Sequence, residues 1–431
     1  MTGQSSGLPA SLVEATAQRV MARCDILAGI SASTTAIERV HLSSEHARAN
    51  ELTARWMAEA GMMTRVDAAG NLLGRLDTGH PDAPALMLGS HLDTVPDAGR
   101  YDGILGVLVA IEVVRLLARR DEDGRAISPF PFALEVIAFA DEEGTRFGRA
   151  LLGSSAVAGD WNTDWWELTD ADGTTLRDAS LAFGLDPEKI GAAARRADEL
   201  VGYLEAHIEQ GTGLDDGREA LGVVTSIASA RRFEISVHGE RRHAGGTTFE
   251  RRRDALLGAS EIALAVERIS RAQHHVVGTV GRLQTVGGAV NIVPGETRLS
   301  LDLRGELDAH RDAVWSEIRA EISAIGERRG LTWTVEDVHN APAVLCSPDL
   351  IGAIEGGIRT ASTSVNAPAA LFSKAGHDAM SLGKLTRVGM LFVRNADGVS
   401  HHPDESVLED DVSRCIRALA ESVILLAGDH A

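Results

Sequence analysis

Two short apolar runs, each followed closely by histidine or acidic residues, constrain the fold of this chain more than any other feature. Residues 85–89 and 132–140 have the composition of buried parallel strands, and residues 104–117 between them form an expected buried helix. Such strand–helix–strand alternation predicts an α/β domain with a mostly parallel sheet and helices on both faces. Ligands of these sheets bind beyond the carboxyl ends of the strands. We therefore expect His91 and Glu143, which follow the two runs, to lie close together.

The alternation changes character near residue 222 and resumes after residue 338. Between these points the sequence predicts a small α+β domain of the ferredoxin-like type. The expected strands are 232–237, 278–287, 297–303 and 331–335, and the expected helices are 253–270 and 310–327. We predict a discontinuous larger domain, residues 1–221 and 337–431, with a smaller inserted domain at residues 222–336.

Composition and charge exclude several classes of partner. With 431 residues and a formal net charge of -20 at pH 7, the chain lacks the basic balance that binding to nucleic acid requires. Its longest apolar stretch, residues 104–117, is too short and too polar to span a bilayer, and no signal peptide is apparent. Cys24, Cys346 and Cys415 form no CxxC pair, which favours free thiols in a reducing compartment. We expect a cytoplasmic protein with no nucleic-acid or membrane partner.

The residues that follow the first run contain possible ligands for divalent metals. His91 comes first, and Asp93 could accept a hydrogen bond from the ring nitrogen of His91 that does not bind a metal. Asp102 lies in a turn flanked by glycines, where a carboxylate can bridge two cations. Taken singly, His91 is weak evidence for a metal site, and Asp102 is more simply explained as an ordinary turn aspartate.

Adjacent Glu142 and Glu143 can divide two tasks between them. One carboxylate can bind a metal, while the other moves a proton between an attacking water and a leaving nitrogen. A solvated acidic turn is the alternative. His207 lies on an expected strand and His401 follows another, which completes the set. His402 is a rival ligand that spacing alone does not exclude.

Together these motifs resemble those of the N-carbamoyl-L-amino-acid and allantoate amidohydrolases. These enzymes belong to the dinuclear metallohydrolases, with the aminoacylase-like and carboxypeptidase-G-like peptidases. The resemblance runs from about residue 39 to the last expected helix. The segments that carry it are 89–95, 101–103, 141–147 and 207–211.

The resemblance implies a metal-dependent hydrolase with two divalent ions per subunit, which are zinc, manganese, cobalt or nickel. It implies that His91 and His207 bind one ion, that Glu143 and His401 bind the other, and that Asp102 bridges them. Glu142 would be the general acid and base, and the family pattern favours His401 over His402.

A second set of residues matches the substrate-binding positions of the same family. His243, Asn291 and Arg304 lie in the inserted domain, and Gln210 lies near the metals. An imidazole can stabilise an oxyanion, and an arginine fork suits a substrate carboxylate. Singly, the first three are equally a loop histidine, a turn asparagine and a surface arginine. The resemblance also implies that residues 1–221 and 337–431 form the metal-binding catalytic domain and that residues 222–336 form a lid and dimerisation domain. In the homodimer that it implies, His243 comes from the partner subunit.

Three residues depart from the family pattern near these motifs. Phe249, Lys374 and Arg394 replace residues of other types. The two cations could favour a substrate with a second acidic group, or could simply face solvent.

The function that this resemblance implies is hydrolysis of the carbamoyl C–N bond of an N-carbamoyl-L-amino acid to the free amino acid, carbon dioxide and ammonia. The alternative is allantoate or a related ureido acid of purine or pyrimidine breakdown, including N-carbamoyl-β-alanine. A peptidase activity is less favoured, because the motifs of the inserted domain match the carbamoyl-cleaving enzymes better than the peptidases. An inactive binding protein on the same scaffold is the alternative from another class, but the presence of Glu142 and of every ligand argues against it.

Overall fold

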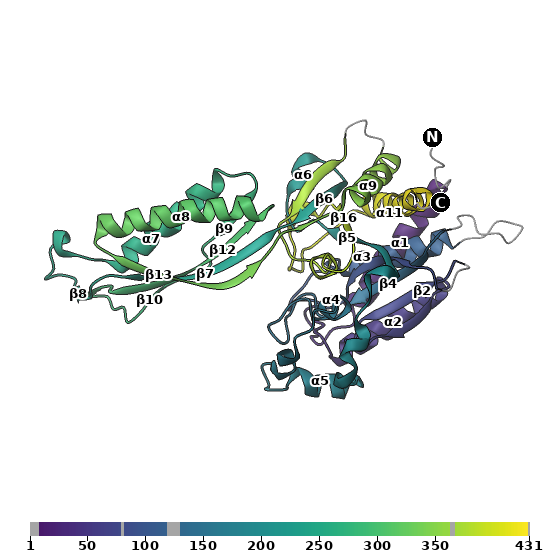
Figure 1. The fold of residues 1–431 in the computed structure, drawn as a ribbon, viewed down its shortest axis with the longest axis horizontal. Coiled ribbons are helices and arrows are strands. Elements are labelled where there is room, and N and C mark those ends of the chain that lie inside the picture. Colours follow the sequence, from purple (N-terminus) through teal and green to yellow (C-terminus); the bar gives the residue numbers. More distant parts are fainter. Residues whose placement is uncertain (1–7, 79–81, 119–129, 363–366, 430–431) are drawn as a thin grey trace, which may run out of the picture. The chain divides into compact units, whose positions relative to one another are not determined.

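The computed structural model describes residues 8–78, 82–118, 130–362 and 367–429 (Figure 1). The chain divides into two compact units. The first comprises Met1–Thr225, Leu345–Leu371 and Gly376–Ala431, and the second comprises Ser226–Val344 and Phe372–Ala375.

A nine-stranded sheet forms the centre of the first unit. Its order is β1-β2-β4-β3-β5-β16-β6-β14, with β15 paired to β6. The central strands β4, β3, β5 and β16 are parallel, whereas the flanking pairs β1-β2, β2-β4 and β16-β6 are antiparallel. The strands are β1 (Met63–Val66), β2 (Leu72–Leu76), β3 (Ala85–His91), β4 (Ala133–Phe139), β5 (Leu200–Ile208), β6 (Leu221–Ile227), β14 (Val344–Leu345), β15 (Ala369–Ser373) and β16 (Val388–Val393). Every residue of β3 and β4 is buried, which explains their apolar sequences and confirms the predicted α/β class.

Helices cover both faces of the parallel strands. Leu204, Ala206 and Ile208 of β5 belong to the main apolar core with α1, α3, α9 and α11. Glu205, which points the opposite way from β5, accepts a hydrogen bond from the backbone N–H of Ala379 at the start of α10. The helices of this unit are α1 (Ala10–Ala28), α2 (Ser44–Glu59), α3 (Ile104–Leu117), α4 (Leu152–Val157), α5 (Leu176–Phe183), α6 (Gly213–Gly217), α9 (Pro348–Ala361), α10 (Ala379–Leu382) and α11 (Glu409–Asp429).

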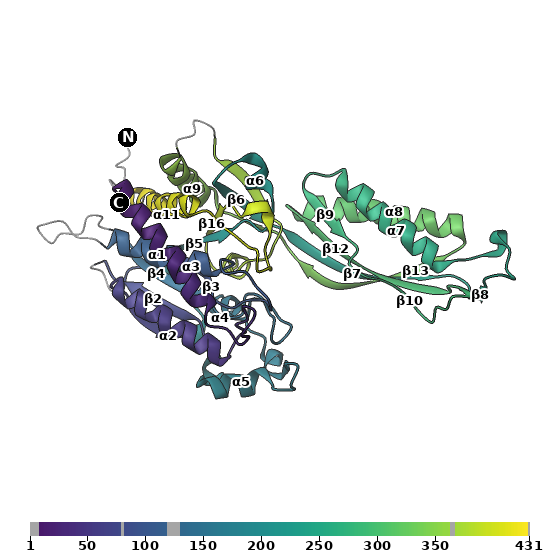
Figure 2. The ribbon, with the colours of Figure 1, turned by 180° about the vertical axis from the view of Figure 1, so that it is seen from behind.

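The second unit is an antiparallel sheet with two helices on one face (Figure 2). Its strand order is β10-β12-β7-β13, and β9 also pairs with β12. The elements are β7 (Ser229–His238), β8 (Arg242–His243), α7 (Ala255–Arg271), β9 (Val276–Thr279), β10 (Leu283–Thr285), β11 (Ile292–Val293), β12 (Glu296–Gly305), α8 (Asp308–Arg329) and β13 (Thr332–Ala341). Alternate residues of β7 and β12 pack against α7 and α8, and the others form a polar face.

The predicted single strand at 278–287 is wrong. Two shorter strands, β9 and β10, share the same edge of β12 instead. Between them Arg282 forms an ion pair with Glu234 of β7. Residues 280–282 face only two residues of β12, 300 and 301, so one extra residue interrupts the predicted strand.

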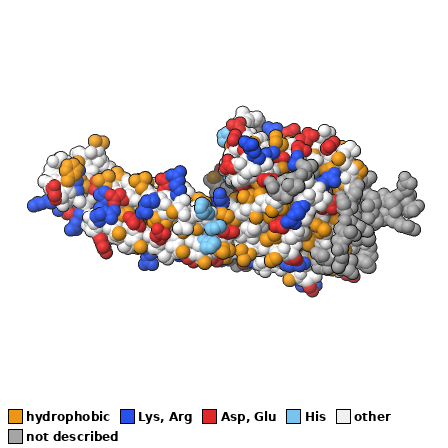
Figure 3. Space-filling view, turned by 90° about the horizontal axis from the view of Figure 1, so that it is seen from above, with side chains coloured by type: hydrophobic (Ala, Val, Ile, Leu, Met, Phe, Trp, Pro, Cys, Tyr) orange, Lys and Arg blue, Asp and Glu red, His pale blue; other side chains and the backbone are white. Residues whose placement is uncertain are grey.

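The surface shown in Figure 3 carries acidic and basic side chains interspersed with one another, together with a group of histidines. Among the described residues, no helix is long and apolar enough to cross a membrane.

Candidate metal centre

Parallel strands deliver the predicted ligands to one edge of the sheet in the first unit. β3 ends at His91, β4 is followed by the segment with Glu142 and Glu143, and β5 carries His207 just before its end. Because these strands are parallel neighbours, the side chains share the carboxyl edge. Asp102 reaches the same place from the turn that precedes α3.

The carboxylate of Asp102 lies at the centre of this group. Its Oδ1 atom is 3.2 Å from Nε2 of His207 and 3.9 Å from Nε2 of His91. Its Oδ2 atom is 3.1 Å from Nε2 of His401, and that nitrogen is 3.5 Å from Oε1 of Glu143. The two oxygens of one carboxylate thus face two different pairs of donors. Imidazole and carboxylate donors in these groups fit divalent cations.

The rings of His91 and His207 are oriented by contacts on the side away from Asp102. Nδ1 of His91 lies 3.1 Å from the backbone oxygen of Asp93, and Nδ1 of His207 lies 2.9 Å from that of Ile208. A carbonyl oxygen only accepts hydrogen bonds, so each Nδ1 donates. Nε2 of each ring is therefore left to bind a cation.

Gly103 makes room for His91. Its φ of +68° is in the left-handed region, and a Cβ atom at this position would lie 2.3 Å from Nε2 of His91. Any other residue would therefore be strained and would also push the imidazole from its place.

Asp93 positions the two adjacent glutamates. Its Oδ1 atom accepts a hydrogen bond from the backbone N–H of Glu142 at 3.1 Å, and its Oδ2 atom accepts one from Glu143 at 3.0 Å. The sequence predicts only a contact between Asp93 and His91, whose Nδ1 lies 3.5 Å from Oδ1. One buried carboxylate thus fixes both the histidine and the loop that carries the glutamates.

The charged groups of the centre perturb one another. Burial is the largest cause that raises the pKa of Glu142 well above its usual range, and burial with nearby Asp102 raises the pKa of Glu143 to about 7. Burial would raise the pKa of Asp102 too, but hydrogen bonds from His207 and His401 hold it well below its usual range. The hydrogen bond to Asp102 raises the pKa of His401 to about 9. Protons and cations therefore compete for the same donors.

Gln210 and the loop around His401 complete the surroundings of Asp102. Nε2 of Gln210 donates to Oδ2 of Asp102 at 3.0 Å and lies 3.1 Å from Nε2 of His401. Ser400 donates to Glu405 at 3.1 Å, and Glu405 also accepts from the backbone N–H groups of Asp102 and of the residue before it. The sequence does not predict this role of Glu405. Its only signal is an acidic residue four positions after His401.

A buried polar layer beneath the centre is also missing from the prediction. Glu205 accepts hydrogen bonds from Ser90 at 3.0 Å and from the backbone of Ala379 at 3.3 Å. The ring of His377 packs edge-on against that of His207, with 4.5 Å between ring centroids. A further group of possible ligands consists of Glu205, His207 and His377. The ring of His207 therefore contacts both Asp102 and the ring of His377.

Residues 87–424 match the model of the peptidase family M20/M25/M40. The chain belongs to this family. Its members are hydrolases that bind metal ions, in agreement with the donor groups around Asp102.

Relatives within the family extend over nearly the whole chain. An N-carbamoyl-L-amino acid amidohydrolase of Geobacillus stearothermophilus is 37% identical and covers 91% of this chain and 93% of its own. An allantoate deiminase of Arabidopsis thaliana is 35% identical over 97% of this chain and 84% of its own. The crystal structure of a hydantoinase/carbamoylase family amidase from Burkholderia ambifaria has a TM-score of 0.86 at 31% identity, with 96% and 98% of the two chains covered.

The M20 chain carries His243 and Asn291 side by side in its second unit. β8 and β11 pair so that Ile292 lies opposite His243, and the backbone N–H of Ala244 donates to the backbone oxygen of Asn291 at 2.9 Å. Nδ1 of exposed His243 accepts from the N–H groups of residues 245 and 246 at 3.2 and 3.0 Å. The neutral ring therefore carries its proton on Nε2, which is then a hydrogen-bond donor.

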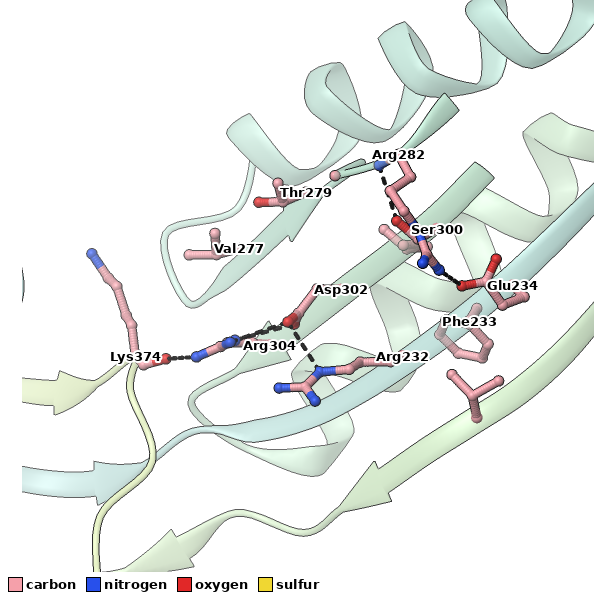
Figure 4. Close-up of a pocket in the computed structure, with 13 residues that line it drawn as sticks. Arg232, Phe233, Glu234, Val277, Thr279, Arg282, Ser300, Asp302, Arg304 and Lys374 are labelled. Atoms are coloured by element: carbon pink, nitrogen blue, oxygen red, sulfur yellow. Dashed lines mark hydrogen bonds and ion pairs between the residues drawn. The ribbon is translucent and has the colours of Figure 1, made fainter. Parts of the chain in front are cut away.

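Arg304 lies at the other end of the second unit. The ten-residue strand β12 separates Arg304 from the β8–β11 ribbon. At roughly 3.3 Å per residue, this strand is about 30 Å long. Figure 4 shows its guanidinium between Asp302, which accepts two hydrogen bonds at 3.1 Å, and the backbone oxygen of Lys374, which accepts one at 2.7 Å. These bonds use three of its five N–H donors. The structure thus does not bring Arg304 to His243 and Asn291 within this unit.

Lys374 and Arg394 have different surroundings. Lys374 lines the same cavity of about 660 Å³ as Arg304, together with Arg232 and Arg282. Arg394 instead pairs with buried Asp411 of α11 at 2.8 Å. Of the two cations that depart from the family pattern, only Lys374 shares a cavity with Arg304.

Replacement of Gly103 by alanine tests the fit around His91. We expect Gly103→Ala to weaken metal binding by more than about 10-fold, because loss of a contact that positions a metal ligand typically costs about 10- to 100-fold in affinity. Turnover should fall with the metal affinity. Gly173→Ala is the matched control, because Gly173 also has a positive φ, +81°, but a Cβ atom there would meet nothing within 4 Å. Isothermal titration with Mn²⁺ or Zn²⁺ measures the effect. Equal affinities for the two variants would contradict it.

Metal binding should strengthen as the pH rises from 6 to 9. The metal-free protein holds protons on His401 up to about pH 9 and on Glu143 up to about pH 7, and a cation must displace them. The affinity should therefore rise across the whole range and most steeply below pH 7. Chelator competition at constant ionic strength checks this, and an affinity independent of pH would contradict it.

Proposed function

We propose that this protein is a two-metal amidohydrolase that cleaves the carbamoyl C–N bond of an N-carbamoyl-L-amino acid. The observation that supports it most is the placement of the two oxygens of Asp102 against two separate donor pairs. His91 and His207 would hold one ion, Glu143 and His401 the other, and Asp102 both. The ions would be zinc, manganese, cobalt or nickel. The name of the 37% identical relative supplies the substrate class.

Bound divalent ions would polarise the carbamoyl oxygen and lower the pKa of a water molecule. Glu142 would take a proton from the attacking water and deliver it to the leaving nitrogen. Burial raises the pKa of Glu142, so its carboxylate accepts a proton more readily than an exposed glutamate does. The amino acid leaves with the nitrogen, and the carbamate that remains breaks down to carbon dioxide and ammonia.

The second unit would supply the groups that recognise the substrate. Nε2–H of His243 would donate to the oxyanion that forms at the carbamoyl carbon, with Asn291 beside it. Arg304 would bind the substrate carboxylate with the donors that Asp302 and Lys374 leave free. Gln210, which contacts Asp102, would contact the substrate next to the metals.

A homodimer would reconcile these roles with the distances. His243 and Arg304 of one chain lie too far apart within the second unit to reach one small substrate. If His243 and Asn291 come from the partner subunit, each site can contain all three residues. Leu257 and Leu264, two exposed leucines seven residues apart on α7, offer apolar surface for such contact.

Allantoate is the second candidate substrate. An allantoate deiminase is 35% identical over nearly the whole chain. Lys374 adds a cation to the cavity that contains Arg304. A further ureido acid, N-carbamoyl-β-alanine, belongs to the same test.

Ammonia release from a panel of N-carbamoyl-L-amino acids, allantoate and N-carbamoyl-β-alanine, together with amino-acid release from dipeptides, tests the proposed function. Protein loaded with manganese or zinc should act best on a carbamoyl amino acid. Glu142→Gln should bind metal and substrate normally but lose about 10²–10⁴-fold in kcat, the usual contribution of a general acid or base. Turnover of dipeptides alone would contradict the proposal, and an active Gln variant would contradict the role of Glu142.

Mixed dimers test whether His243 acts across the subunits. Glu142→Gln and His243→Ala should each be inactive alone. Refolded or co-expressed together, they should regain about a quarter of the wild-type activity, because half of the dimers are mixed and one of their two sites is complete. A mixture that stays inactive while size-exclusion chromatography shows mixed dimers would contradict the shared site.

A further inference from the structure

A second group of metal-ligating side chains lies in the second unit. His275 comes just before β9, Glu306 directly follows β12, and His310 lies in the first turn of α8. Nδ1 of His275 is 2.6 Å from Oε2 of Glu306, and the rings of His275 and His310 have centroids 5.2 Å apart. One ligand atom from each of the three residues lies within 4.8 Å of the others.

The protein's own contacts leave this group incomplete. Nδ1 of His310 is buried and has no hydrogen-bond partner among the described residues. A buried polar atom without a partner is costly, and a ligand or ion commonly satisfies it. The backbones of the other two residues are joined, because the N–H of Glu306 donates to the backbone oxygen of His275 at 2.9 Å. His275 and Glu306 are thus held together by the fold as well as by their ion pair, and the first turn of α8 brings His310 beside them.

We propose that His275, Glu306 and His310 bind one divalent cation of the zinc class. Two imidazoles and one carboxylate are a zinc-type donor set, with a fourth position open to water. Two ligands of a tetrahedral zinc lie about 3.3 Å apart, so a small opening of the His275–Glu306 pair admits the ion. The side chain of His275 is 58% exposed, which gives the ion a path from solvent.

This site would serve a different purpose from the metal centre of the first unit. Its ligands join the end of β12, the start of β9 and the start of α8, so a bound ion would fasten three elements of the second unit. Glu306 lies two residues after Arg304, just beyond the end of β12. The ion would therefore also fix the strand end that carries the proposed carboxylate-binding arginine.

Zinc stoichiometry of the full-length protein tests this proposal. After equilibration with Zn²⁺ and dialysis, the wild type should hold one zinc per chain more than the double variant His275→Asn/His310→Asn, as measured by inductively coupled plasma mass spectrometry. His274→Asn is the matched control, since it removes a neighbouring exposed histidine that is outside the group. It should keep the wild-type stoichiometry.

Two further readings keep the outcomes distinct. Zinc should raise the melting temperature of the wild type more than that of the double variant. If the double variant folds poorly, Glu306→Gln takes its place in the comparison, and it should also hold one zinc fewer than the wild type. Ammonia release measured separately reports on the metal centre, so failure of that activity leaves this test intact. Equal zinc content in the wild type and in the folded double or Glu306→Gln variant would overturn the proposal, as would the same loss in His274→Asn.

Discussion

The contact of the Asp102 carboxylate with two separate donor pairs is the feature on which the candidate site depends. Asp102, Glu142, Glu143 and Asp93 place several carboxylates in a small and mostly buried space. Buried acidic groups are costly unless opposite charges accompany them. Without cations, protons on His401 and on the glutamates fill that role, which is the physical origin of their raised pKa values. The same arrangement makes the site ready to exchange protons for divalent ions.

The supports of Asp102 come from segments that are far apart in the chain. Glu405 accepts from its backbone N–H, Gln210 donates to its side chain, and Gly103 leaves space for the imidazole of His91. Asp93 positions the loop of the two glutamates by accepting hydrogen bonds from their backbone N–H groups. These contacts restrict the positions of the ligands before any ion binds, and such restriction is what gives a metal site its geometry.

Much of the first unit follows from periodicity. Fully buried strands have mostly apolar sequences, and parallel strands share one carboxyl edge, so the placement of His91 and Glu143 could be predicted from the pattern. The choice of His401 rests on family likeness, because spacing does not separate it from His402. Glu405 and His377 could not be predicted, since their roles depend on loops that only the tertiary fold brings to the site.

The second unit shows where periodicity is insufficient. Its apolar alternation predicts β12 well, but one extra residue between β9 and β10 divides the neighbouring strand in two. Position along β12 also matters for function. The β8–β11 ribbon with His243 and the end of β12 with Arg304 lie at opposite ends of the second unit, a separation that sequence motifs do not reveal. The proposed homodimer would allow both residues to reach one small substrate.

Anomalous diffraction from crystals of the metal-loaded protein tests the central claim most directly. Data collected at the absorption edge of the loaded metal, manganese or zinc, should give two peaks on either side of the Asp102 carboxylate. One peak should lie against His91 and His207 and the other against Glu143 and His401. Peaks elsewhere with none at Asp102, or a single ion that Asp102 does not touch, would contradict the account.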